Sequence, residues 1–434
     1  MSNMGGYDYL IIGNSAGAVG CIEGLRSVDK SGTMALVSEE ECRVYSRALI
    51  PYYLGGHIAR DRLYYRPLDF YDRAHVGVFN GHRAVKIDTA VRMVKLDDGN
   101  SMSYGKLLIA AGGKPFYPPI PGLDKKNVYS FHSMSDVQGI EKELPGVRSA
   151  VVLGGGVIGL MAAEVLHGKG IRVHVLELAD RLLAPVVDET TSQLVENALR
   201  ETGVDLYLNN TIGQIHGGER VESITLKDGR TIPCDLLIVG VGVAPRVELA
   251  EHAGIQVNRG IVVDKKMQTS VPGIFACGDC ASTYNFLTDA VQNMPLWPNA
   301  YLGGRVAGYN MAGAEREYTL GTQMNAMHFF DVNIVSAGIN VTEANQNDSL
   351  DIIKNYDAEK KVYRKFVFSK EGTITGFILV GQIDRAGIFL NLMRRKVDVR
   401  GFRKEMFKNS FGYADLPETL RWQLLQDDVI LGVV

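Results

Sequence analysis

The chain has 434 residues, of which 46% are apolar and 22% charged, so it is a globular protein long enough for two or three separate cores rather than a disordered chain. Its formal net charge of -3 gives no sign of a nucleic-acid partner. No apolar run reaches the roughly eighteen residues of a membrane span, the start lacks the marks of a secretion signal, and the five cysteines are too few and odd in number for a secreted disulfide framework, so we expect a cytoplasmic protein.

The first predicted unit is the run YDYLIIGNSAGAVGCIEGLR, which reads as a short apolar strand, a glycine turn and a helix. This pattern is typical of dinucleotide-binding βαβ units: Gly13 permits the tight turn, Ser15 lets a pyrophosphate approach, and Ala18 lets helix and strand pack closely. The phosphates would then meet the helix N-terminus. The next strand, TMALVSEE, should bring a carboxylate to a ribose, and we favour Glu39 over Ser38 there. Taken alone, the pattern would fit an ordinary packed turn equally well.

A second and fuller glycine pattern follows a proline-rich crossover, YGKLLIAAGGKPFYPPIPG, which suits a linker between domains. The run SAVVLGGGVIGLMAAEVLHGKGIRVHVLELADR supplies strand, turn, helix and strand, with Gly154, Gly156 and Gly159 in the three glycine roles. Glu177 ends the second strand, where a carboxylate binds both hydroxyls of an adenosine ribose and would repel a 2′-phosphate. Glycines that only close a packed turn are the alternative, which the acid in register disfavours.

The remaining motifs lie after this second pattern. The segment CDLLIVGVGVAP repeats the strand and turn of the crossover, and MQTSVPGIFACGDCAS ends a strand at Gly278 and Asp279. Two dinucleotide patterns in one chain indicate either an internal duplication or one domain inserted into another. Toward the C-terminus, KVYRKFVFSKEGTITGFILVG alternates apolar and polar residues about a Glu-Gly turn, which predicts a hairpin, and IDRAGIFLNLMRRKV predicts a helix.

Taken together, these motifs resemble the FAD- and NAD(P)H-dependent pyridine nucleotide-disulfide oxidoreductase superfamily, and the resemblance covers essentially the whole chain. It implies an α/β fold with two Rossmann-like, three-layer dinucleotide-binding domains and a C-terminal α+β domain that forms a homodimer interface. The FAD-binding domain would be split over residues 1–118 and 245–320, around an inserted NAD-binding domain at 119–244. The dimerisation domain would follow over 325–434.

The resemblance also implies which residues hold the two cofactors, FAD and NAD(H). Val85 would meet the adenine of FAD, Asp279 would bind the ribityl chain, and the helix that starts near Trp297 would point its N-terminus at the flavin pyrimidine. The implied FAD-binding residues are Gly13, Ser15, Ala16, Glu39, Arg47, Val85, Ala111, Gly112, Asp279 and Trp297. The implied NAD-binding residues are Gly154, Gly156, Val157, Ile158, Gly159, Glu177 and Gly242.

The predicted redox centre differs from that of the thiol-active relatives, in which one cysteine precedes a Gly-Leu-Pro-Tyr run over the flavin. The segment RVYSRALIPYYLGG places Ala48 in that register, so no thiol can accept electrons at this position. Tyr45 and Arg47 instead resemble rubredoxin reductases and the flavin part of NADH-dependent nitrite reductases, which send electrons singly to an iron-sulfur centre. The implied function is an NADH oxidoreductase that passes electrons through FAD to an iron-sulfur protein or subunit of the ferredoxin or rubredoxin type. Hydride transfer needs no evident acid or base, so we assign no catalytic residue.

Two other functions stay open at this point. A cysteine-independent NADH oxidase would give the electrons to oxygen or another small acceptor. A flavoprotein subunit would instead serve mainly to bind within a larger redox complex.

Two further features have alternative interpretations. Cys277 and Cys280 have the spacing of a redox pair, but we favour buried packing residues because Asp279 between them is assigned to the flavin. A basic run near the C-terminus is either a docking patch for an acidic iron-sulfur partner or, as we favour, a solvated or dimer-edge surface. It consists of Arg394, Arg395, Lys396, Arg400, Arg403, Lys404 and Lys408. The nine histidines lack metal-ligand spacing, so we predict no metal site.

Overall fold

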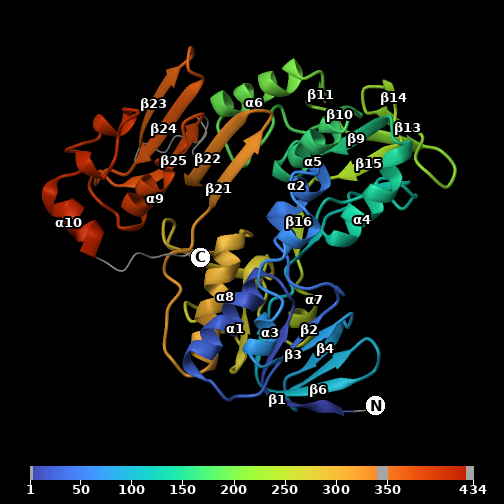
Figure 1. Cartoon of the computed structure of the whole chain (residues 1–434), viewed down its shortest axis with the longest axis vertical. Coiled ribbons are helices and arrows are strands. Elements are labelled where there is room, and N and C mark those ends of the chain that lie inside the picture. Colours follow the sequence, from blue (N-terminus) through green and yellow to red (C-terminus); the bar gives the residue numbers. More distant parts are fainter. Residues whose placement is uncertain (1–2, 340–349, 427–434) are drawn as a thin grey trace.

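A computed structural model describes residues 3–339 and 350–426 of the chain. Figure 1 shows a lower part coloured blue and yellow, an upper part in green, and a C-terminal part in orange and red. Among the described residues, no helix is long and apolar enough to cross a membrane. Because blue and yellow share the lower part, segments far apart in the sequence fold together there.

The lower part is built on a seven-stranded sheet of order β3-β2-β1-β6-β5-β4, which β18 joins by pairing with β6. The pairs among β1, β2, β3, β6 and β18 are parallel, whereas β4 and β5 pair antiparallel beside β6. A strand from late in the chain thus completes a sheet begun near the N-terminus, which is the arrangement that an inserted domain produces. The elements are β1 (Asn3–Ile12), α1 (Ala16–Val28), β2 (Met34–Ser38), β3 (Val76–Asn80), β4 (Ala84–Asp88), β5 (Met93–Leu96), β6 (Ser101–Ile109), β18 (Ile274–Ala276) and α8 (Trp297–Met311).

Helices α1 and α8 lie side by side in the core of this lower part (Figure 1). Their backbones touch at glycines: a Cβ on Gly304 would overlap the carbonyl oxygen of Gly17, and one on Gly308 would overlap that of Cys21. Because the contacting positions rise together along both helices, the helices run in parallel. Both N-termini therefore point to the same end of the sheet.

The upper part holds a five-stranded sheet, all parallel, of order β11-β10-β9-β15-β8. A small antiparallel sheet of β12, β13 and β14 adjoins it. The elements are β8 (Val128–Tyr129), α4 (Met134–Glu143), β9 (Ser149–Leu153), α5 (Val157–Gly168), β10 (Arg172–Leu176), α6 (Glu189–Glu201), β11 (Asp205–Tyr207), β12 (Ile212–His216), β13 (Ser223–Leu226), β14 (Thr231–Pro233) and β15 (Leu236–Val239).

The chain crosses between the lower and upper parts through two short strands. These are β7 (Gly113–Pro115) and β16 (Val243–Pro245), which pair antiparallel. The predicted domain boundaries, after residues 118 and 244, lie close to this crossing, and the division of the chain into domains stays a prediction.

The C-terminal part is an antiparallel sheet of order β21-β22-β25-β24-β23. The hairpin predicted around the Glu-Gly turn is confirmed by β24 and β25, with Gly372 at φ +82 in the turn, and the helix predicted next is confirmed as α9. Residues 340–349 and 427–434 of the predicted C-terminal range lie outside the described residues. The elements are β21 (Met324–Phe329), β22 (Val332–Gly338), β23 (Asp351–Asp357), β24 (Val362–Phe368), β25 (Ile374–Val380), α9 (Ala386–Arg394) and α10 (Glu418–Gln426).

The two faces of this C-terminal sheet pack against different neighbours. On one face, Tyr363, Ile378 and Val380 share a hydrophobic core with the sheet and helices of the upper part. On the other face, Phe366 and Phe377 pack with α9. The fold class predicted from the sequence, two parallel-sheet parts and a C-terminal α+β part, is therefore confirmed. The predicted role of this part in dimerisation stays a prediction.

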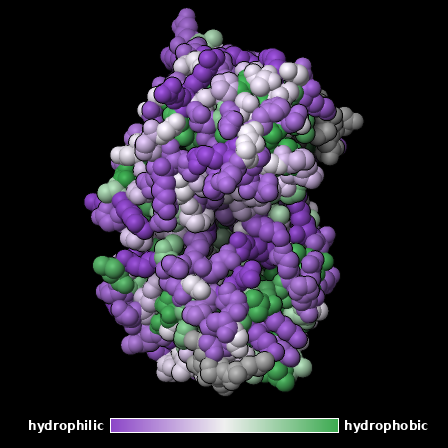
Figure 2. Space-filling model, turned by 90° about the vertical axis from the view of Figure 1, so that its right-hand side faces the viewer, coloured by the Kyte–Doolittle hydropathy of each residue, from purple (hydrophilic) through white to green (hydrophobic). Residues whose placement is uncertain are grey.

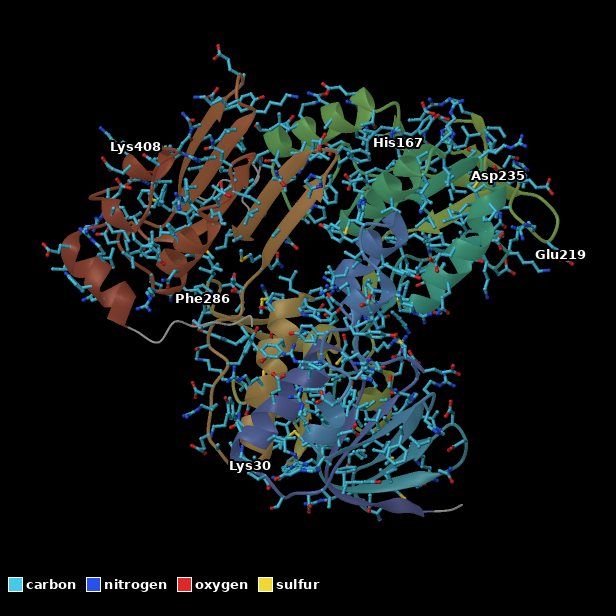
Figure 3. All side chains as sticks on the ribbon, in the orientation of Figure 1. Lys30, His167, Glu219, Asp235, Phe286 and Lys408 are labelled. Carbon is cyan, nitrogen blue, oxygen red and sulfur yellow. The ribbon has the colours of Figure 1, made fainter. Side chains whose placement is uncertain are left out.

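Segments outside the three sheets connect the parts. Helix α2 (Ile50–Gly55) buries Ile50 and Leu54 in the core of the upper part. Along the chain, however, it comes between β2 and β3, which belong to the lower part. Phe286, labelled in Figure 3, likewise belongs to the core of the C-terminal sheet. The other elements are α3 (Phe70–Arg73), α7 (Glu248–His252), β17 (Ile261–Val262), β19 (Ala281–Asn285) and β20 (Ala290–Asn293).

Candidate active site

A single cavity of ≈ 2510 Å³ runs from the first glycine turn in the lower part to the second glycine turn in the upper part. Figure 2 shows the surface hollowed between its upper and lower halves, with mainly hydrophilic side chains around the hollow. Of the seventeen cofactor-binding residues predicted from the sequence, all but Gly159 line this cavity. The structure thus brings the two sets of predicted residues together in one continuous space.

The first glycine turn has the backbone that its sequence predicted. Gly13 has φ +108, and a Cβ there would overlap the carbonyl oxygen of Ala110, so only glycine fits. Ser15 is the N-cap of α1, and Ala16 is its first residue. The cavity therefore reaches the N-terminus of a 13-residue helix, where backbone N–H groups favour an anion.

Glu39 and Val85 line the part of the cavity beyond this turn. Glu39 is exposed and forms an ion pair with Arg246, a residue that the sequence did not single out. Ser38 is buried, and its hydroxyl accepts a hydrogen bond from the backbone N–H of Glu40 at 3.2 Å. Glu39 is therefore the better candidate for a ribose carboxylate, as the sequence predicted.

Asp279 and Trp297 lie where α8 meets the cavity. Burial raises the pKa of Asp279, and the nearby Arg47 opposes that shift. Trp297 is the first residue of α8, and its ring packs edge-on against Tyr65 with the centroids 5.0 Å apart. Gly112, in the adjacent turn, has φ +69.

A network of polar side chains surrounds Arg47. Its guanidinium forms an ion pair with Glu40 and donates to the Tyr45 hydroxyl at 3.0 Å and to the carbonyl oxygen of His132 at 2.8 Å. Burial alone would raise the pKa of Glu40, but Arg47 and the hydrogen bond from Tyr45 hold it below its ordinary value. Burial, and then the charge of Arg47, lower the pKa of His132 to about 4. The sequence missed Glu40 and His132, because His132 is 85 positions from Arg47 along the chain and belongs to no motif.

The cavity has Ala48 in its wall, and the two thiols that line it are protonated near neutral pH. Cys42 lies 3.7 Å from a carboxylate oxygen of Glu40, and burial together with that charge raises its pKa to about 11. Cys277 is fully buried, and burial raises its pKa well above the ordinary value. Cys280 is also fully buried, and neither forms a disulfide within the described chain. These findings favour the packing role predicted for Cys277 and Cys280.

The second glycine turn repeats the first. Gly154 has φ +115, and a Cβ there would lie 2.5 Å from the carbonyl oxygen of Gly240. Gly159 does not line the cavity, and a Cβ on it would overlap the carbonyl oxygen of Gly154, so a glycine there allows α5 to pack closely against the turn. Its predicted contact with NAD stays a prediction. Val157 and Ile158 begin α5 and line the cavity.

Glu177 faces this second turn. One carboxylate oxygen accepts from the N–H of Gly155 at 2.6 Å and the other from the N–H of Ala179 at 2.7 Å. A carboxylate offers about four lone-pair sites, so two hydrogen bonds leave capacity for ribose hydroxyls. Arg181 forms an ion pair with the neighbouring Asp180 at 3.1 Å.

The donors around the cavity suit two dinucleotides. A Cβ on Gly112, Gly156 or Gly242 would meet no other heavy atom of the described chain within 4 Å, so the backbone there is open to a close ligand. Helices α1, α5 and α8 all begin at the cavity, and within the described residues no side chain caps their N-termini. Backbone N–H groups at uncapped helix ends are the donors that diphosphates prefer.

The basic run lies in the C-terminal part. Arg400 pairs with Asp398, and Arg403 pairs with Asp351 and lies 3.9 Å from the ring centroid of Phe368. Burial lowers the pKa of Arg394. In the lower part the structure also places His82 near Asp97 and Asp98, with ligand atoms within 4.8 Å of one another, and Nδ1 of His82 lies 3.1 Å from a carboxylate oxygen of Asp98.

Comparison with known proteins identifies the family. The model of the pyridine nucleotide-disulphide oxidoreductases matches residues 7–304, and that of the rubredoxin NAD+ reductase C-terminal domain matches residues 324–397. The chain belongs to the pyridine nucleotide-disulphide oxidoreductase family, and it is an FAD-dependent NAD(P)H oxidoreductase.

Similar proteins include subunit epsilon of NADH-dependent phenylglyoxylate dehydrogenase from Aromatoleum evansii, 30% identical over 92% of this chain and 94% of that one. Rubredoxin-NAD(+) reductase from Pseudomonas putida is 32% identical over 70% of this chain and 80% of its own. The crystal structure of the covalent putidaredoxin reductase-putidaredoxin complex matches with a TM-score of 0.82 at 25% identity, over 92% of this chain and 94% of that one. The chain spans about half the length of two Bacillus subtilis relatives, the assimilatory nitrate reductase electron transfer subunit (51%) and nitrite reductase (48%).

Proposed function

We propose that this chain takes a hydride from NADH onto bound FAD and passes the electrons singly to an iron-sulfur protein or subunit. FAD, when bound, supplies the exchange between two-electron and one-electron steps. The similarity to a rubredoxin reductase and to a putidaredoxin reductase structure supports this acceptor class.

The observation that carries the proposal is the composition of the cavity wall around Ala48. A thiol relay requires a thiolate, and the alanine side chain at this position has no redox chemistry. Burial and neighbouring charge keep Cys42 and Cys277, the thiols that do line the cavity, protonated near neutral pH. Electrons that enter the cavity are therefore expected to leave it directly from the bound flavin to a partner.

In this proposal, the residues of the chain bind and orient FAD and stabilise the charge that it carries. We propose that FAD binds along the first turn, with Glu39 on a ribose, Val85 at the adenine and Asp279 on the ribityl chain. Arg47, fixed by Glu40 and Tyr45, would place a permanent positive charge beside the flavin nucleotide. The N-terminus of α8 would favour the negative charge of a reduced flavin.

NADH is proposed to bind along the second turn, with its pyrophosphate near Gly156, Val157 and Ile158. Glu177 would hold the ribose hydroxyls and discriminate against NADPH. We further propose that the protein is a cytoplasmic homodimer.

An anaerobic stopped-flow experiment tests the proposal. In the first mixing step, NADH should reduce the flavin of the purified yellow protein. In the second step the reduced protein is mixed with rubredoxin, ferredoxin or oxygen, and the iron-sulfur protein should reoxidise the flavin faster than oxygen does. Rapid turnover with oxygen alone would support an NADH oxidase instead, and failure of every iron-sulfur acceptor would overturn the assignment of the acceptor.

A second candidate is an electron-transfer subunit of a larger oxidoreductase. The similarity to subunit epsilon of a multi-subunit dehydrogenase over nearly the whole of both chains favours it. Purification of the tagged protein from its native cells should then recover iron-sulfur subunits in fixed stoichiometry, and recovery of the chain alone would favour a free reductase.

A further inference from the structure

The loop 182–187, between β10 and α6, forms the wall of the cavity next to the second glycine turn. Four of its residues line the cavity, namely Leu183, Ala184, Pro185 and Val186. Leu183 is buried with φ +54, a backbone conformation that a leucine adopts only when its surroundings hold it there.

This loop is in direct contact with the glycine turn. The N–H of Leu183 donates to the carbonyl oxygen of Gly155 at 3.0 Å, and the N–H groups of Val186 and Val187 donate back to the carbonyl oxygen of Leu183. Gly155 in turn donates its own N–H to Glu177 at 2.6 Å. The position of the loop therefore sets the shape of the proposed NADH site.

A row of side chains on the C-terminal sheet, polar except for Ile378, faces the same loop. Asn325 pairs with Ser336, Ser336 with Ile378, and Ile378 with Lys365, so these side chains share one face across β21, β22, β25 and β24. Asn325 lines the cavity, and the Ser336 hydroxyl donates to the carbonyl oxygen of Val186 at 2.8 Å. One end of this row thus holds the loop directly.

The other end of the row holds the end of the loop through Asp188. Tyr363 donates its hydroxyl to a carboxylate oxygen of Asp188 at 2.7 Å, and the Lys365 ammonium lies 3.2 Å from the same oxygen. The lysine side chain is 1% exposed and the aspartate 6%. Asp188 also caps α6 by accepting from the backbone N–H of Thr191 at 3.1 Å. Moving either partner away would leave a buried charge without its counter-charge, which is energetically costly. The ion pair therefore fixes the geometry at this point.

A third contact holds α5, the helix that begins at the glycine turn. The turn between β21 and β22 places Phe330 and Asp331 at φ +47 and +67, and the N–H of Phe330 donates to a carboxylate oxygen of Glu164 at 2.8 Å. The Phe330 ring lies 6.4 Å from that of His167, which is labelled in Figure 3 near the end of α5. The C-terminal sheet therefore supports both the loop and the helix of the second turn.

We propose that Ser336, Tyr363 and Lys365 of the C-terminal sheet, acting through Val186 and Asp188, are positioning residues that hold loop 182–187 in the shape that binds NADH. The proposal rests on the proposed function, because it takes the second turn as the NADH site. Ser336 contacts the loop, whereas Tyr363 and Lys365 contact Asp188 directly after it. None of the three lines the cavity. Weakening them should lower the affinity for NADH while leaving the bound FAD and the chemistry of hydride transfer unchanged.

Three variants of the FAD-bound protein test this. Tyr363→Phe removes the hydrogen bond to Asp188 but keeps the ring, and Ser336→Ala removes the bond to Val186. Arg364→Met is the matched control: Arg364 is a buried cation on the same strand, but it faces the other way and donates to the carbonyl oxygen of Phe407 and to Gln382.

Anaerobic stopped-flow reduction by NADH gives the dissociation constant and the limiting rate for each variant. We expect the dissociation constant to rise about three- to tenfold in Tyr363→Phe and Ser336→Ala, as for the loss of one buried hydrogen bond, with the limiting rate within about twofold of the parent and no change in Arg364→Met. An unchanged dissociation constant in both test variants, or an equal rise in the control, overturns the proposal.

Hydrogen-deuterium exchange over residues 179–188, without NADH, separates this inference from the proposed function. Exchange should be faster in the two test variants and unchanged in Arg364→Met. If NADH fails to reduce even the parent flavin, the proposed function fails, whereas the exchange still reports on the loop. Equal exchange in all four proteins overturns the positioning role.

Discussion

The two glycine turns of this molecule share one local backbone but differ in what surrounds it. Gly13 and Gly154 have φ +108 and +115, and each faces the carbonyl oxygen of the residue directly after a neighbouring strand, Ala110 after β6 and Gly240 after β15. The first turn leads into α1, which packs on α8 through glycines, whereas the second leads into α5, which the turn between β21 and β22 contacts through Phe330. The turn itself is thus encoded within a few residues, and its support comes from segments far along the chain.

The largest expected effect comes from adding one methyl group to each turn. Gly13→Ala should abolish FAD binding and give a colourless protein, because its Cβ would overlap the Ala110 backbone. Gly154→Ala should keep FAD but slow flavin reduction by NADH on the order of a hundredfold, from a strain of roughly 3 kcal/mol. Absorbance spectra and stopped-flow traces measure both outcomes.

Gly203→Ala is the control for backbone strain alone. Gly203 has φ +87, and a Cβ there would meet no heavy atom within 4 Å in the part of the chain that the structure describes. It should cost only about 1 to 2 kcal/mol of stability and leave both cofactors bound. If Gly13→Ala and Gly154→Ala lost the same cofactor, the assignment of the two turns would be wrong.

A smaller effect is expected at the two ribose carboxylates. A 2′-phosphate about 4 Å from Glu177 is disfavoured by about 1 kcal/mol in water-like surroundings and about 4 kcal/mol at an intermediate dielectric, so NADH should be preferred at least tenfold. Glu177→Gln should reduce the preference for NADH over NADPH. Glu39→Gln should weaken the retention of FAD and leave the preference for NADH unchanged. The measurement is the ratio of kcat/KM for NADH to kcat/KM for NADPH in each protein. Equal kcat/KM values for the two nucleotides in the parent would place Glu177 away from the ribose.

The sequence predicted those elements and site residues whose structure depends on the pattern of neighbouring residues. The glycine turns, the hairpin, α9 and the positions of Glu39 and Glu177 at the cavity follow from neighbouring residues, because a tight turn or an alternating strand needs particular side chains at fixed spacing. The ribose contacts of the two carboxylates stay predictions. Arg246, His132 and Asn325 reach the cavity only through long-range folding and belong to no motif. Asp188 and Lys365 show the same limit, since their ion pair joins positions 177 residues apart (365 − 188). Such contacts depend on how sheets pack, which local pattern does not determine.

The Arg47 network makes the stability of the protein depend on pH through His132, which lies between β8 and α4. The pKa of His132 falls from 6.5 to about 4 on folding, so the unfolded chain binds more protons between these values. The stabilisation is therefore complete above about pH 6.5 and is lost as the pH falls toward about 4. Thermal unfolding of the parent and of His132→Gln at about pH 7 and about pH 5 should show a smaller acid-induced drop in Tm for the variant. Equal drops would contradict a half-buried imidazole that stays neutral in the folded protein.

The smallest effect is expected at the basic run in the C-terminal part, away from both turns. Arg400 and Arg403 are already paired with carboxylates, and Arg394 is half-buried, so charge reversal is better placed at Lys404 and the exposed Lys408, which Figure 3 labels. We expect Lys404→Glu with Lys408→Glu to change electron transfer to an iron-sulfur acceptor by less than about twofold at low salt. A large drop that disappears at high salt would show that the run is a docking patch.

The absence of a thiol relay beside Ala48 is the central claim, and an anaerobic titration of the FAD-bound protein with dithionite tests it most directly. The account predicts that two electrons per FAD reduce the flavin completely, in the parent and in Cys277→Ser with Cys280→Ser alike, because no cysteine pair takes up electrons. Uptake of four electrons per FAD in the parent, falling to two in the double variant, would contradict the account and show that the thiols carry electrons.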